Sequence, residues 1–178
     1  MKQKRLSKGF TLIEILVYIG VLVIVVLAVS SFFLWTIRSN AKSKAEIETL
    51  ESARVAMGIL TSEIREANSV YSPTSVFLSS GGQLSLETAK YLPAGETTSF
   101  IDFYLCAKRL CLKKEGQDPV ALTSDRTEIE SLEFFQVLTT STAPSIKIDL
   151  KINYKTSSAG PGFKASASLS STAALRSY

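Results

Sequence analysis

A single carboxylate, Glu14, lies at the start of a long uncharged stretch. Of all the residues in the chain, this one has a type and position that most clearly predict a specific interaction, an ion pair. Glu14 closes the segment KGFTLIE at residues 8–14, and the 23 residues 15–37 after it carry no charge. As a helix that stretch would measure about 34 Å, enough to cross the ~30 Å hydrocarbon core of a bilayer. An ionised side chain at the edge of such a span is costly without a positive partner. Glu14 therefore needs a cation.

Residues 9–14 (GFTLIE) resemble the cleavage signal of type IV prepilins, which implies cleavage of the peptide bond between Gly9 and Phe10 and would supply that cation. This cleavage would leave an α-amino group about one helical turn from Glu14, and opposite charges attract far more strongly in a low dielectric than in water. Glycine suits a cleavage site because the missing Cβ lets a protease approach the backbone closely. If such helices pack side by side, Glu14 of one chain can reach Phe10 of the next.

The segment GFTLIE at residues 9–14, with a short basic leader before it and an apolar helix after it, resembles the N-terminal signal of type IV prepilins and pseudopilins. The resemblance implies that a membrane prepilin peptidase cleaves after Gly9, removes the leader 1–9 and methylates the new N-terminal residue, Phe10. It also implies that Glu14 neutralises an N-terminal amine during assembly. The partners would be other pilin or pseudopilin subunits, an inner-membrane assembly platform and membrane lipid.

Two other readings of the N-terminus remain open. A secretory signal also has a basic start and an apolar core, and residues 28–30 (AVS) form a passable small-residue cleavage site. Against it, the apolar stretch continues through Trp35, and Glu14 would interrupt the core. An ordinary single-pass anchor explains the length and hydrophobicity, but not the order of residues 9–14.

The charge balance argues against a global attraction to nucleic acid. The chain has 20 Lys and Arg against 16 Asp and Glu, a net charge of +4. Four of the basic residues lie in the leader, which leaves 16 of each sign after cleavage. Positive residues before a first span stay cytoplasmic. We therefore expect the N-terminus inside, the domain outside the cytoplasm and, after assembly, a pilus or pseudopilus at the cell surface or in the periplasm.

After the span the pattern remains helical. An apolar stripe recurs every three to four residues along an otherwise charged segment, which predicts a helix packed on a domain. The stripe consists of Leu50, Ala53, Met57, Leu60, Ile64 and Ala67. We expect a transmembrane and assembly helix over 10–37, an amphipathic continuation over 38–71 and a β-rich extracytoplasmic domain over 72–178. Pro73 marks the end of the helical signal.

The rest of the chain reads as strands. Residues 146–154 alternate apolar and polar side chains, the clearest strand pattern in the sequence, and residues 163–169 predict its hairpin partner. Further strands are predicted at 100–105, 110–113 and 132–137. An antiparallel sheet whose apolar face covers the helix stripe satisfies these patterns. The predicted fold class is α+β, with a long N-terminal helix and an antiparallel sheet, as in pilins.

Cys106 and Cys111 can pair in an extracytoplasmic compartment. With Lys108 and Arg109 as a two-residue turn, the cysteines would face each other at a closely spaced position of a hairpin, within disulfide reach. Two free buried thiols are the alternative. A metal site is not expected, because the chain has no histidine and the cysteine spacing is not that of a zinc finger.

No set of residues assembles into a catalytic motif, so we predict a non-enzyme without cofactors that is itself an enzyme's substrate. Aspartates 102, 125 and 149 are scattered along the sequence. One basic cluster, Lys108, Arg109, Lys113 and Lys114, reads as a solvated turn. Nucleic acid is therefore not an expected partner, although DNA uptake by a competence pilus stays an alternative.

Short matches indicate the kind of subunit. Residues 53–70, 119–124, 132–134 and 174–176 resemble J-type pseudopilins and W-type minor pilins. Ser31 stands where many major pilins have a helix-kinking proline, and the acidic cluster of a calcium-binding major pseudopilin is not evident. These departures favour a minor subunit with a priming or tip role. Whether it serves a pilus, secretion or competence system is left open by the sequence.

Overall fold

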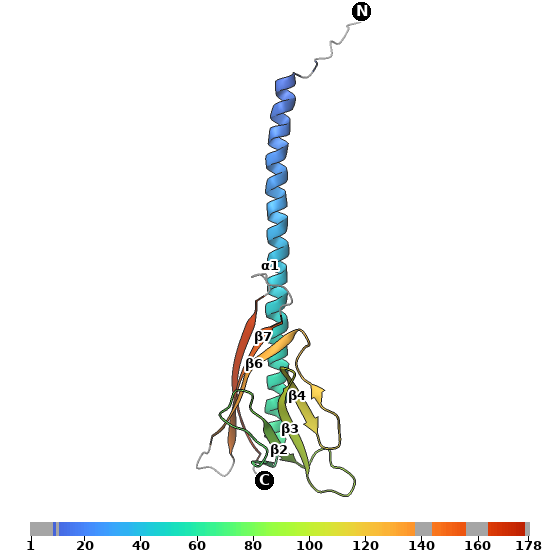
Figure 1. Ribbon diagram of the computed structural model, residues 1–178, viewed down its shortest axis with the longest axis vertical. Helices are drawn as coiled ribbons and strands as arrows, with labels where there is room; N and C mark the ends of the chain where they lie inside the picture. The colour runs from blue at the N-terminus through green and yellow to red at the C-terminus, as the bar shows by residue number, and fades with distance from the viewer. Residues whose placement is uncertain (1–8, 10, 138–143, 156–163, 177–178) are drawn as a thin grey trace, which may run out of the picture. The chain divides into compact units, whose positions relative to one another are not determined.

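The computed structural model (Figure 1) describes residues 9, 11–137, 144–155 and 164–176. These residues form one helix, α1 (Leu12–Glu66), and eight strands. The strands are β1 (Ser69–Val70), β2 (Leu84–Thr88), β3 (Ser99–Cys106), β4 (Arg109–Lys114), β5 (Val120–Ala121), β6 (Thr127–Val137), β7 (Ser145–Tyr154) and β8 (Ser166–Ala174). The chain divides into two units, Met1–Ala41 and Lys42–Tyr178, with the boundary inside α1. The predicted α+β class is confirmed.

The first unit contains the apolar part of α1. Every large apolar side chain from Leu12 to Ile37 is at least half exposed. A helix that is apolar all round and exposed has no protein surface to bury it, and its internal hydrogen bonds satisfy the backbone without water. By length and composition α1 can cross a membrane.

The second unit begins with the amphipathic part of α1. The predicted stripe is confirmed: Leu50 is half-buried and its other members are buried. The helix ends at Glu66, so the expectation of helix as far as residue 71 is wrong. The chain turns earlier because the Asn68 amide donates to the Glu87 carbonyl at 2.8 Å, and β1 then pairs with β2.

The strands form two antiparallel sheets where the sequence predicted one. β1 to β5 follow one another in order in the larger sheet, and β6, β7 and β8 form the smaller one. The predicted strands at β3, β4, β6 and β7 are confirmed, as is the pairing of β8 with β7. β2 was missed because its alternation is short, yet Leu84 and Leu86 are fully buried there.

The core lies among the amphipathic part of α1 and both sheets. It joins Leu60 and Ile64 of α1 with Phe103 of β3, Phe134 of β6 and Ile148 of β7, all of them inaccessible to solvent. Burial of such side chains stabilises a domain by about 1.5–3 kcal/mol each relative to exposure. The stripe on α1 therefore fixes the helix to the sheets.

The outer face of the smaller sheet is polar, and two of its carboxylates, Asp149 and Glu130, form ion pairs. The Lys147 ammonium lies 2.8 Å from Asp149 and, together with the Ser170 hydroxyl, lowers the pKa of that carboxyl. Hydrogen bonds from Lys151 and then Asn153 likewise lower the pKa of Glu130. Both sites are solvent-accessible, so each pair contributes little to stability.

Candidate processing and assembly site

The chain before α1 is fixed by a cap. Thr11 immediately precedes the helix, and the Glu14 amide donates to the Thr11 carbonyl at 3.1 Å and to its hydroxyl at 3.4 Å. Thr11 and Glu14 have the spacing of a capping box, and a carboxylate in the first turn interacts favourably with the helix dipole. Thr11 thus sets where the helix begins and places Glu14 in its first turn.

Glu14 has a second partner that the sequence reasoning missed. The Tyr18 hydroxyl donates to Glu14 Oε1 across 3.3 Å, one turn further along α1. The spacing of four residues, which brings side chains together on a helix, was the signal available in the sequence. The carboxylate is therefore engaged from its own helix through Oε1.

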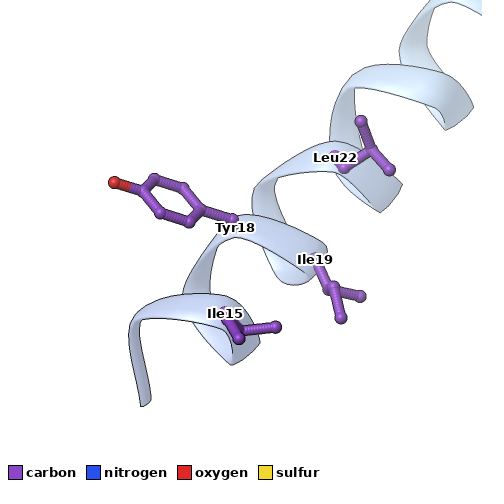
Figure 2. Close-up of a pocket in the computed structure, with 4 residues that line it drawn as sticks. All are labelled: Ile15, Tyr18, Ile19 and Leu22. Atoms are coloured by element: carbon purple, nitrogen blue, oxygen red, sulfur yellow. The ribbon is translucent and has the colours of Figure 1, made fainter. Parts of the chain in front are cut away.

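Beside this pair the helix surface is apolar. Ile15, Tyr18, Ile19 and Leu22 line a shallow depression of about 360 Å³ over two turns of α1. In Figure 2 the Tyr18 ring extends away from the helix with its hydroxyl at the outer end. All four side chains are at least half exposed. Such a surface suits lipid or a second apolar helix rather than a polar ligand.

The predicted cleavage position, Gly9, is accessible to solvent. A Cβ added to it would meet no atom within 4 Å. Packing within the described residues therefore does not require glycine here. Phe10, the residue predicted to be methylated, lies outside the described residues.

The second unit holds the predicted disulfide, and Cys106 and Cys111 are bonded. The prediction of the pair is confirmed, but the predicted turn is wrong. Ala107 and Lys108 form it, with φ angles of 48° and 62°, so Cys106 pairs with Arg109 and Cys111 with Tyr104. The cysteines lie diagonally across the hairpin with Cα atoms 5.9 Å apart, within the usual disulfide range.

The basic residues of this hairpin lie in different surroundings and not in one cluster. Lys108 pairs with Glu128 at 3.2 Å, and the Lys114 ammonium lies 3.6 Å from the centre of the Tyr91 ring. Lys113 is adjacent to Lys114 in β4, and consecutive strand residues point to opposite faces. These side chains do not form one continuous surface. Within the described part of the chain, no group of three or more His, Cys, Asp or Glu could hold a metal ion.

Comparison with known proteins identifies the N-terminal segment. Residues 4–30 match the family model of the prokaryotic N-terminal methylation motif. No curated protein and no solved structure matches the chain significantly. The matched residues include Gly9, Phe10, Glu14 and most of the exposed apolar helix. The chain therefore carries a type IV pilin-like prepilin signal, which makes it a pilin-type substrate of prepilin peptidase with a membrane-anchoring helix.

Proposed function

We propose that the protein is a minor pilin or pseudopilin subunit that prepilin peptidase cleaves after Gly9 and methylates at Phe10. It assembles through its N-terminal helix into a type IV pilus or a type II secretion pseudopilus. The observation that carries this proposal is the methylation motif over residues 4–30, with Glu14 as the only acidic side chain in it. The remaining apolar surface of that helix is exposed and available to other subunits.

A structural role is further supported by how the carboxylates of the second unit are used. Asp102 accepts a hydrogen bond from the Ser85 hydroxyl at 2.5 Å, and Asp149 is paired with Lys147. Asp125 is exposed in the loop before β6. These side chains stabilise strands and turns. We infer that the protein acts by assembly and not as an enzyme.

The priming or tip position rests on two features of the chain. Ser31 lies within an uninterrupted helix, and its hydroxyl donates to the Leu27 carbonyl at 2.9 Å. The resemblance of short segments to J-type and W-type subunits supports the same position. For orientation, the basic leader favours a cytoplasmic N-terminus and an extracytoplasmic domain.

The test is mass spectrometry of the chain purified from membranes of its own host. We expect the mature protein to begin at an N-methylated Phe10. In a strain without the prepilin peptidase, the same chain should retain Met1 and the leader. An intact Met1 in the normal host, or a start near Ser31, would instead identify a plain anchored binding domain or a secreted one.

A further inference from the structure

Before cleavage, the Glu14 carboxylate lacks the α-ammonium partner that the proposed charge pair would provide. Until the leader is cleaved, the Phe10 nitrogen is in a peptide bond and no α-amine is present near Glu14, whose helix continues with exposed apolar side chains such as Ile15 and Ile19. An unpartnered carboxylate in an apolar medium is unfavourable. A donor within the same helix would remove much of that cost.

We propose that the Tyr18 hydroxyl is this donor: it positions the Glu14 carboxylate in the uncleaved precursor until an α-ammonium group replaces it. Tyr18 Oη lies 3.3 Å from Glu14 Oε1, and its ring belongs to the exposed apolar surface shown in Figure 2. Tyrosine suits a membrane edge because its ring is apolar and its hydroxyl is polar.

The contact has the properties of a donor that can be replaced. At 3.3 Å it is longer than the ~2.7–2.8 Å typical of O–H···O bonds, so it is weak. A hydrogen bond from an ammonium to a carboxylate is roughly twice as strong as one between neutral groups. An incoming α-ammonium would therefore displace the hydroxyl, whereas lipid acyl chains, which offer no donor, would not.

The inference rests on the proposed function of Glu14, but its test does not need a filament. The full precursor is placed in phosphatidylcholine nanodiscs and treated with dicyclohexylcarbodiimide, a lipophilic reagent for carboxyl groups in apolar surroundings. In the precursor the Phe10 nitrogen is in a peptide bond, so no free amine can substitute for Tyr18. Mass spectrometry of the N-terminal peptide gives the rate at which Glu14 is modified.

We expect Tyr18→Phe to raise the initial rate at Glu14 by roughly 2- to 3-fold, the effect of losing one weak hydrogen bond. Phenylalanine keeps the ring, so steric shielding of the carboxylate stays the same. Tyr71→Phe, a partly exposed tyrosine of the second unit, is the matched control and should leave the rate unchanged. An unchanged or lower rate in Tyr18→Phe, with helix content preserved by circular dichroism, overturns the proposal.

This outcome is separate from the outcome for the proposed function. Normal filament assembly by a Glu14→Ala variant would refute the charge pair. The rate of carbodiimide modification of Glu14 would still test the role of Tyr18. Conversely, if Tyr18→Phe does not change the rate at which Glu14 is modified, the positioning role of Tyr18 is refuted, while the assembly role of Glu14 is unaffected.

Discussion

The Ser52 hydroxyl of α1 lies 3.2 Å from the Thr127 hydroxyl at the start of β6. The same Ser52 oxygen accepts a hydrogen bond from the Ser124 amide at 3.2 Å. Thr127 in turn donates to the Ser124 carbonyl at 3.0 Å. Ser52 and Thr127 are both buried, so these polar atoms depend on one another for partners. The contact joins the helix to the loop that leads into the smaller sheet.

Ser52→Ala should destabilise the second unit by about 1–2 kcal/mol, because it leaves the Ser124 amide and the Thr127 hydroxyl short of a partner. For a chain of this size that corresponds to a melting temperature lower by roughly 2–8 °C. Thermal unfolding of the full chain in detergent micelles, followed by near-ultraviolet circular dichroism, measures the melting temperature. Ser62→Ala on the exposed face of α1 is the control and should stay within about 0.5 kcal/mol. Equal melting temperatures for the two variants would contradict this role.

Removing the disulfide with Cys106→Ala and Cys111→Ala should also lower stability. The loop it closes is short, with a sequence separation of 5, and for such a loop the chain-entropy model gives about 2 kcal/mol. Ala107 and Lys108, both at positive φ, lose the covalent link that closes their turn. Thermal unfolding with and without a reductant checks this. Reductant should lower the melting temperature of the wild type and leave the double variant unchanged; a wild type that does not respond would refute it.

Asp149 should confer a small stability that depends on pH. Its pKa is lowered in the folded state by Lys147 and Ser170, so its contribution is present above the ordinary aspartate value of about 3.9 and is lost as the pH falls through the lower folded value. Asp149→Asn should therefore cost less than about 1 kcal/mol at pH 7. Denaturant midpoints of the two proteins should converge in strong acid. Asp118→Asn, exposed in the loop before β5, is the control and should match the wild type throughout.

The sequence predicted most elements because strong periodicity marked them. The stripe through Leu60 and Ile64 identified the buried face of α1, and alternation over 146–154 identified β7. What it did not predict depends on tertiary pairing. Asparagine directly after the apolar stripe was a local signal for the end of α1, but the hydrogen bond from Asn68 to β2 that fixes this end depends on tertiary pairing. The same holds for the division into two sheets.

The candidate site was predictable in its residues and only partly in its contacts. Gly9, Phe10 and Glu14 follow from a motif whose spacing has a chemical reason, and the family model matches that segment. The Tyr18 contact was not predicted because the charge pattern points to a cation for Glu14, whereas the partner four residues away is a neutral hydroxyl. The hairpin register was missed because Ala107 and Lys108 occupy positive-φ positions that favour glycine or asparagine, and neither residue type marks a turn there.

Glu14→Ala should separate processing from assembly. We expect the peptidase to recognise the leader and Gly9, so cleavage and methylation should proceed in the variant. Mass spectrometry of the N-terminus measures both. Assembly should fail, because an α-ammonium brought among apolar helices would lack its carboxylate, and opposite charges interact most strongly in that medium. Recovery of the chain in sheared filament fractions, or its cross-linking to other subunits, measures the loss. Asp118→Asn, which removes an exposed carboxylate from the loop before β5, is the control and should assemble. Assembly of Glu14→Ala at the wild-type level would refute the charge pair, whereas failure of cleavage would show that Glu14 acts earlier, in recognition by the peptidase.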